Sequence, residues 1–388
     1  MNCVLGRMAF RSTVRAAVVC IMLIVVRLEP CFSQERQIDP QSDFRQQLQS
    51  LADLSPSPCP PDAHEKDWHF ADSESRLFNQ AANIVAEALN AADPSQVAPR
   101  ERAANALKAL ERMSTKINVD WPSDNRFHFE ILDVSPALVV KMGIREHESF
   151  FVYGIPEKDS GKPNRLWQEV GSDDNLFDPP PGVRLNLYPL HRGPSGNARF
   201  LAKSLNAGCA GSMGVAYEAY EWNPEGTGNL DEIIKQAGAL GLDDKVSGFE
   251  WIGKLQTDSP LITLPYCWFS AIDTWDNPSL CAVDTYDLSG DDVKFRSRTY
   301  NRPDLLPIAK AIEYAAGRDY PAVLGYCASE EIASTLVREI PPFVFAGDLR
   351  VTPTADWKER VELGDGPAYR FDVERRGDRW LVVWFQAE

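Results

Sequence analysis

The densest group of residues able to do chemistry lies between positions 266 and 277. Within it, the aromatic rings of Tyr266, Trp268 and Trp275 stand close in sequence to the carboxylates Asp273 and Asp276. Aromatic faces stack on sugar rings, and carboxylates accept hydrogen bonds from hydroxyl groups. These five residues are the candidate binding site. The alternative is structural, because a core strand followed by a turn has the same composition.

More carboxylates occur on two predicted strands, Glu218 and Glu221 on one, and Asp284 and Asp287 on the other. Paired carboxyl groups about 5–9 Å apart can hydrolyse a glycoside. Two functional hypotheses follow. The first is a binding or interaction module whose ligand is an unknown small molecule, glycan or protein. The alternative is a secreted hydrolase that acts on a glycan, so the sequence leaves open whether the protein is an enzyme.

Motifs that look like catalytic signatures fail on spacing or context. His64 and His69 are five residues apart, whereas a zinc-protease helix needs a spacing of four. The 210–214 segment has the A-x-S-x-G form of a hydrolase elbow, but all five histidines precede Ser212, and no later histidine can serve as its base. No complete phosphate-binding loop or dinucleotide fingerprint occurs. We therefore expect neither a metal site nor a cofactor.

The first 33 residues have the pattern of a secretory signal peptide. Arg7, Arg11 and Arg15 precede an apolar run over 16–26, and small residues at Cys31 and Ser33 suit a cleavage site. The run is shorter than the roughly 20 residues of a membrane span. We predict export to the periplasm or the extracellular space, with an N-terminal membrane anchor as the alternative. No later segment approaches membrane length, so we expect no membrane span in the mature chain.

Composition limits the partners and the redox state. The formal net charge of −16 disfavours nucleic-acid binding, because an acidic surface repels phosphate backbones. The hydrophobic content of 44% suffices for a packed core. Cys267 and Cys281 lie on successive predicted strands, and neighbouring strands bring Cα atoms within disulfide range. We predict a disulfide between them, with two buried thiols as the alternative.

Hydrophobic periodicity predicts an α+β fold. The expected order is a helical hairpin, a mixed and mainly antiparallel β region, and a smaller C-terminal unit of helices plus a four-stranded antiparallel sheet. The predicted divisions are a signal peptide over 1–33, a Pro-rich linker over 34–70, a main domain over 71–300 and a C-terminal unit over 301–388. A short helix around Phe44–Leu54 is expected to interrupt the linker.

Within these divisions, the first helix of the hairpin is expected to begin at Asp72 or Ser73 and the second at Pro99. Helical periodicity also predicts helices over 197–205 and 230–239 inside the β region. The last predicted strand, 380–385, is apolar on both faces. Such a strand is covered on both sides, so we expect Trp384 in the core.

The export hypothesis predicts the N-terminus of the mature protein. N-terminal sequencing of protein purified from its native host should begin near Gln34, because cleavage follows the small residue Ser33. A mature chain that still carries residues 16–26 would show that the segment is an anchor.

Overall fold

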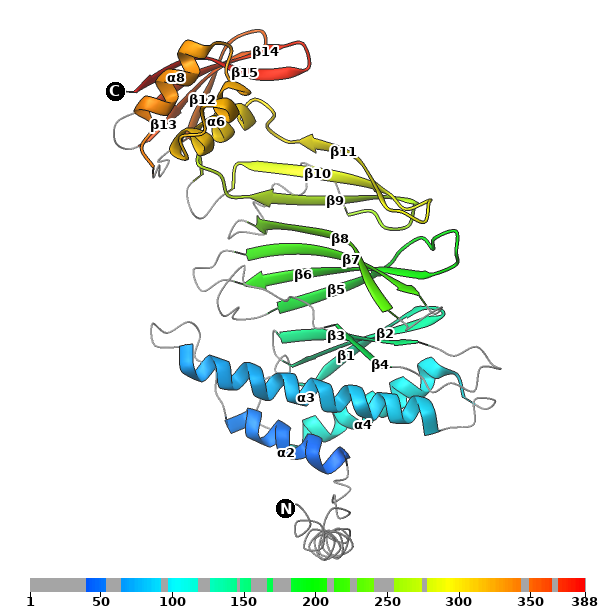
Figure 1. The fold of residues 1–388 in the computed structure, drawn as a ribbon. Coiled ribbons are helices and arrows are strands. Elements are labelled where there is room, and N and C mark those ends of the chain that lie inside the picture. Colours follow the sequence, from blue (N-terminus) through cyan, green and yellow to red (C-terminus); the bar gives the residue numbers. More distant parts are fainter. Residues whose placement is uncertain are drawn as a thin grey trace, which may run out of the picture.

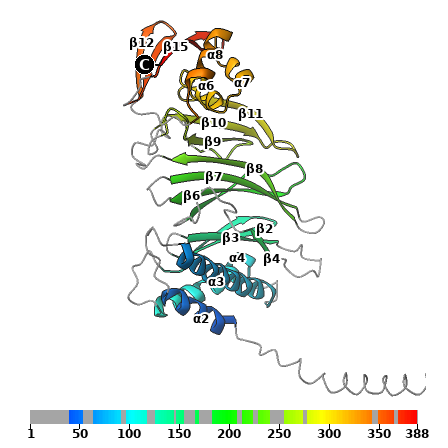
Figure 2. The ribbon, with the colours of Figure 1, turned by 60° about the vertical axis from the view of Figure 1, so that its left-hand side comes forward.

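The structure is a computed structural model. It describes residues 40–53, 64–91, 97–117, 126–144, 147–154, 166–169, 183–207, 213–223, 229–240, 255–273, 278–342, 349–364 and 369–387. The molecule is elongated, with a group of helices at one end and the C-terminal unit at the other (Figures 1 and 2). The predicted α+β fold is confirmed.

Three helices cover one face of the first strands (Figure 1). They are α2 (Pro40–Asp53), α3 (His64–Ala91) and α4 (Pro99–Ile117). The pairing of α3 with α4 confirms the predicted hairpin. However, α3 starts before Asp72 and Ser73. The short helix expected within the linker is confirmed as α2. Phe44, Leu48 and Leu51 explain this, because their spacing puts all three on one helical face that is fully buried.

The main sheet has eleven strands in the order β1-β2-β3-β5-β6-β7-β8-β9-β10-β11, with β4 paired to β3. The strands are β1 (His128–Val134), β2 (Ala137–Ile144), β3 (His147–Gly154), β4 (Leu166–Glu169), β5 (Val183–Pro189), β6 (Ala198–Ala207), β7 (Met213–Asn223), β8 (Asn229–Leu240), β9 (Leu261–Trp268), β10 (Leu280–Asp287) and β11 (Lys294–Tyr300).

Two of these strands correct the sequence prediction. β6 and β8 replace the helices expected over 197–205 and 230–239. Alanine, leucine and lysine give both segments a local preference for helix. Tertiary context overrides that preference, since β6 pairs along its whole length with β7 and along most of it with β5.

The two faces of the sheet line three successive apolar cores in turn. One face of β1–β3 packs on the helices, and the other packs on β5–β7. The opposite face of β5–β8 shares a third core with β9 and β10. Phe150, Phe200 and Tyr220 meet in the second core with ring centroids 5.4–5.6 Å apart. These rings come from β3, β6 and β7, so the sheet must curl strongly between β3 and β5.

At that curl the backbone ladder almost disappears. β3 and β5 share one residue pair, His147 with Val183, and it is parallel. Side chains replace the missing ladder bonds at Leu185 on β5. The Leu185 N–H donates to Glu148 Oε2, and Lys141 Nζ donates to the Leu185 carbonyl at 2.9 Å.

Glu148 is held by a second partner on β1. His128 Nε2 lies 2.8 Å from Glu148 Oε1, and Gly143 stands between these two residues in the β1–β2–β3 row. A Cβ at Gly143 would come within 2.3 Å of the imidazole, so the contact requires glycine there. The hydrogen bond to Glu148 raises the pKa of His128. Burial pushes the pKa of Glu148 upward, but hydrogen bonds from His128 and Leu185 and the charge of Lys141 bring it below its usual value.

A second break lies between β8 and β9, which share the pair Ala239 and Cys267. The Tyr217 hydroxyl crosses it and donates to the Pro265 carbonyl at 2.8 Å. Arg199, which is 1% exposed, bonds Glu221 on β7 and the carbonyls of Leu288, Gly290 and Asp291 after β10. Buried side chains thus hold the β9–β11 end to the rest of the sheet.

The C-terminal unit packs three helices on a four-stranded antiparallel sheet in the order β12-β13-β14-β15, as predicted. Its elements are α6 (Leu306–Ala316), α7 (Tyr320–Leu324), α8 (Glu330–Glu339), β12 (Leu349–Ala355), β13 (Lys358–Leu363), β14 (Tyr369–Arg376) and β15 (Arg379–Ala387). Ser329 caps α8, accepting from the Ile332 N–H.

The expectation that Trp384 lies in the core is wrong. A β-bulge shifts the β14–β15 register at Val383, so Val382 and Phe385 both face the helices although they are three residues apart. Trp384 turns to the outer face, is 39% exposed and contacts the Arg360 guanidinium.

The β3–β5 junction yields a stability prediction. Glu148→Gln should lower the free energy of unfolding by about 3 kcal/mol near neutral pH, because it leaves buried Lys141 without its inner carboxylate. Glu130→Gln is the matched control. Glu130 also pairs with Lys141, at 3.0 Å, but it is 52% exposed, so its loss should cost less than about 1 kcal/mol. Urea unfolding measures both changes, and equal losses would contradict the bridging role.

The same junction predicts a pH dependence. The raised pKa of His128 gives stability that is complete below pH 6.5 and is lost as pH rises through its folded pKa. The lowered pKa of Glu148 gives stability that is present above 4.5 and is lost as pH falls through its folded pKa. The stabilising effect of the pair should therefore peak between these values and shrink on either side. A Glu148→Gln variant whose deficit stays constant from about pH 5 to pH 9 would contradict this.

Candidate functional site

The five predicted site residues have different positions. Tyr266 and Trp268 lie on one face of β9 with ring centroids 6.0 Å apart. Asp273 stabilises the following turn, accepting from Ser270 and from the Ser279 N–H at 2.7 Å. Trp275 and Asp276 lie outside the described residues. Of the five, Tyr266 and Trp268 are brought together on an ordered surface, while Asp273 has a structural role in the turn.

The predicted disulfide is confirmed. Cys267 and Cys281 are directly opposite each other on β9 and β10, and their sulfur atoms are bonded with Cα atoms 3.9 Å apart. Their side chains occupy the face opposite Tyr266 and Trp268, because neighbouring positions of a strand point to opposite faces. The crosslink therefore ties together the two strands beneath the aromatic face.

Three further rings extend this face toward the edge strand β11. Tyr300 pairs with Ala282, and the small alanine lets its ring approach Trp268 to 6.1 Å. Tyr286 and Phe295 meet at 5.6 Å. We call the surface formed by Tyr266, Trp268, Tyr286, Phe295, Arg298 and Tyr300 the aromatic shelf.

A β-bulge decides that Phe295 belongs to the shelf. The β10–β11 register shifts between Thr285 and Tyr286, which leaves Arg296 as an extra residue on β11. Phe295 and Arg298 therefore share a face although three positions separate them, and the Arg298 guanidinium lies 5.9 Å from the centre of the Phe295 ring. In a regular strand these two side chains would point to opposite faces.

An ion pair occupies the middle of the shelf. Arg298 Nε and Nη2 donate to the two oxygens of Asp284 at 2.7 and 2.8 Å, and Asp284 is fully buried. The same guanidinium lies 5.7 Å from the centre of the Tyr266 ring. Burial, followed by the Asp284 charge, raises the pKa of Tyr266, while the hydrogen bond to Asp284 raises that of Arg298. Both residues keep their protons at any physiological pH.

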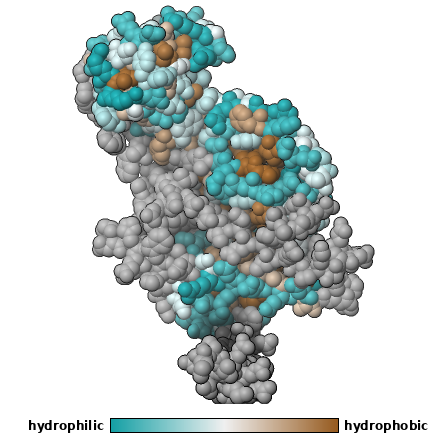
Figure 3. Space-filling view, viewed as in Figure 1, coloured by the Kyte–Doolittle hydropathy of each residue, from teal (hydrophilic) through white to brown (hydrophobic). Residues whose placement is uncertain are grey.

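Exposure increases across the shelf toward the edge. Tyr266 on β9 is 4% exposed, whereas Phe295 on β11 is 53% exposed and Tyr286 and Tyr300 are half-buried. Figure 3 shows one face of the molecule, with an apolar patch ringed by hydrophilic residues below the C-terminal unit; on its colour scale tyrosine, tryptophan and arginine are not hydrophobic.

The carboxylates of the hydrolase hypothesis are each held by their own partners. Glu221 bonds Arg199, Asp284 bonds Arg298, and Asp287 bonds Arg296. Glu218 accepts from the Tyr220 hydroxyl at 2.7 Å. Positions three apart on a regular strand face opposite sides, so neither Glu218 and Glu221 nor Asp284 and Asp287 form a pair on one face.

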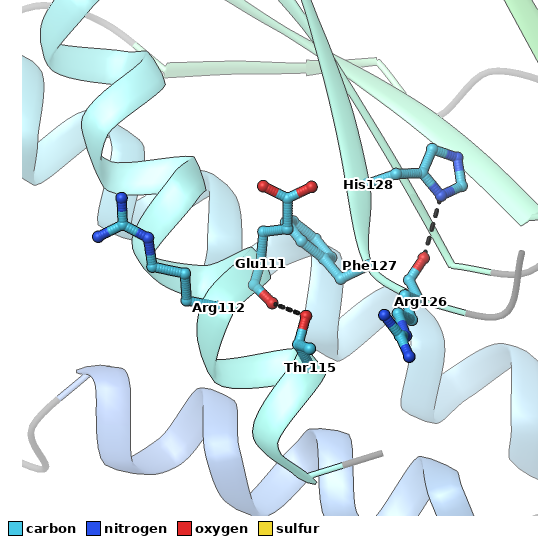
Figure 4. Close-up of a pocket in the computed structure, with 6 residues that line it drawn as sticks. All are labelled: Glu111, Arg112, Thr115, Arg126, Phe127 and His128. Carbon is cyan, nitrogen blue, oxygen red and sulfur yellow. Dashed lines mark hydrogen bonds between the residues drawn. The ribbon is translucent and has the colours of Figure 1, made fainter. Parts of the chain in front are cut away.

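A pocket of about 340 Å³ lies elsewhere, between α4 and the start of β1 (Figure 4). Its polar groups do not converge on a common point. The guanidinium groups of Arg112 and Arg126 point in different directions (Figure 4), Thr115 donates to the Glu111 carbonyl, and both ring nitrogens of His128 are hydrogen-bonded. The pocket therefore offers little to orient a ligand.

One titratable cluster lies in the C-terminal unit. Burial, followed by the neighbouring Asp304 carboxylate, raises the pKa of Glu359 to about 7, and Arg302 pairs with both residues. The cluster joins the segment before α6 to β13. Among the residues that the structure describes, no group of three or more His, Cys, Asp or Glu is arranged to hold a metal ion, and no helix is long and apolar enough to cross a membrane.

Comparison with protein-family models, with curated proteins and with solved structures finds no match to this chain. Function is therefore inferred from the geometry of the shelf.

Sequence reasoning missed four shelf residues, Tyr286, Phe295, Arg298 and Tyr300. The available signal was the run Lys294–Tyr300, in which Phe295 stands between two basic residues and Tyr300 ends the segment. That run predicts a strand, but it does not show that the strand borders Tyr266 and Trp268.

The buried ion pair yields a prediction for the shelf. Arg298→Ala should lower the free energy of unfolding by about 3 kcal/mol, because Asp284 would remain buried without a counter-charge. Arg360→Ala is the matched control, since Arg360 makes a similar two-bond pair with Asp372 on an exposed sheet face. The decrease in the free energy of unfolding caused by Arg360→Ala should be clearly smaller. Chemical unfolding measures both, and an Arg298→Ala variant as stable as the control would show that the pair does not support the shelf.

Proposed function

We propose that the mature chain is an exported, non-catalytic binding module and that its ligand-contacting surface is the aromatic shelf. The observation that carries the proposal is a group of five rings, a contacting trio and a contacting pair, with the ion-paired Arg298 between them. The group opens to solvent at the edge strand β11. Aromatic and arginine side chains of this kind dominate the energy of binding surfaces.

The strands beneath the aromatic shelf are crosslinked and are bonded to the rest of the sheet. The disulfide joins β9 and β10, and Arg199 and Tyr217 fasten this end of the sheet to the strands before it. A surface that is ordered before binding loses less conformational entropy when a ligand arrives. The signal-like segment and the disulfide both suit an oxidising compartment outside the cytoplasm.

A binding module explains the carboxylates better than a hydrolase does. General acid and nucleophile roles require two carboxyl groups that face one cleft. The carboxylates of β7 and β10 instead accept hydrogen bonds from arginine or tyrosine neighbours, which stabilise the sheet.

A ligand screen on the mature protein tests the proposal. Compounds from sugar, peptide and metabolite collections should include some that raise the melting temperature of the wild type. The same compounds should lose that effect with Phe295→Ala, because the truncated ring is exposed and contributes little to folding. Glycan probes should be recovered uncleaved. Compounds that stabilise both proteins equally would place the binding surface elsewhere, and cleaved glycans would favour the hydrolase.

A further inference from the structure

We infer that the ligand of the aromatic shelf is a single, uncharged glycan chain. This inference rests on the proposed function and specifies the chemical class of ligand for the same surface. It starts from the mixture of groups on the shelf, where ring faces alternate with hydroxyl and guanidinium groups. Sugars have the same mixture, with apolar C–H faces and polar hydroxyl edges.

The charge balance of the shelf favours an uncharged ligand. Arg298 is its central cation, and both oxygens of Asp284 neutralise it through two hydrogen bonds. An acidic ligand would have to compete with a fully buried carboxylate for the guanidinium, and a basic ligand would face the guanidinium itself. The guanidinium edge and the Tyr286 hydroxyl remain suitable partners for neutral hydroxyl groups.

The orientations of the rings favour a single glycan chain as the ligand over the flat surface of a packed, crystalline polysaccharide. The planes of Trp268 and Tyr300 meet at 71°, and those of Tyr286 and Phe295 at 74°. Such edge-to-face pairs form no common plane, so they cannot match the flat surface of a crystalline polysaccharide. A glycan chain that turns from one unit to the next can present a ring face to one pair and a hydroxyl edge to the next.

The dimensions are also suitable. Phe295 and Tyr300 mark the two ends of the shelf along β11. Their partners Tyr286 and Ala282 are four residues apart on β10, which corresponds to about 13 Å of extended strand. That length accommodates a short oligosaccharide rather than one monosaccharide. We therefore expect affinity to increase with chain length until the shelf is filled.

Other polymers fit the shelf less well. A polypeptide strand adding to β11 would meet Lys294, Arg296 and the β-bulge, which are features that protect an edge strand from further pairing. A nucleic acid would meet a protein with a net charge of −16.

Titration of the mature protein with defined polysaccharides tests the inference. The neutral probes are laminarin, galactomannan and soluble starch, and the charged probes are polygalacturonate and heparin. An extended peptide of alternating Glu and Val represents strand addition. Affinity electrophoresis and isothermal calorimetry measure binding to the wild type, Phe295→Ala, Phe295→Tyr and Trp357→Ala. Trp357 is the control because it is an equally accessible ring, 62% exposed, outside the shelf.

At least one neutral polysaccharide should bind the wild type. Phe295→Ala should weaken binding at least tenfold, equivalent to about 1.4 kcal/mol, whereas Phe295→Tyr and Trp357→Ala should retain it. Circular dichroism should show the same fold for all four proteins. Binding of a charged polysaccharide or the peptide, lost in Phe295→Ala, would overturn the glycan inference and leave the shelf as a binding surface. Binding that survives Phe295→Ala, or no binding by any probe, would overturn both.

Discussion

The structure depends on buried polar side chains that bridge two breaks in the main sheet. The ladder of the eleven-stranded sheet curls, and it thins to one residue pair at β3–β5 and again at β8–β9. Unpaired backbone groups at such places are costly when buried. Glu148 and Lys141 satisfy Leu185 at the first break, and Tyr217 and Arg199 satisfy carbonyls across the second.

These bridges explain how the apolar cores follow one another along the molecule. Because the sheet turns at each break, one face of β1–β3 meets the helices while the other meets β5–β7. The opposite face of β5–β8 then packs against β9 and β10. The same closure buries the β9 side of the shelf and leaves its β11 side open. The same curling of the sheet therefore buries Tyr266 and leaves Phe295 exposed.

Charge in this protein mainly supports architecture. The fully buried residues Arg199 and Asp284 each have a charged partner on a neighbouring strand. Carboxylates used in this way are unavailable as paired catalytic acids, whereas the ring surface they support remains exposed. The arrangement thus supports the proposed binding role.

Local pattern was enough to predict much of the fold. Alternation and turn residues predicted the disulfide strands around Cys267 and Cys281, and Pro99 marked a correct helix start. These features depend on neighbours in sequence. The segments at 198–207 and 229–240 were predicted as helices because their composition favours helix, and only their pairing within the sheet makes them strands.

The candidate site shows the same division between features that depend on sequence neighbours and features that depend on strand pairing. Residues 266–268 could be identified from their density of rings, because composition is local. Phe295, Arg298 and Trp384 could not be placed, because single-residue bulges in β11 and β15 change which face each side chain occupies. A one-residue shift in register leaves the hydrophobic pattern of the sequence unchanged, and it is resolved only by the partner strand. The sequence alone thus determined that a ring-rich β strand is present, and the tertiary structure decided which rings share a surface and which of them reach solvent.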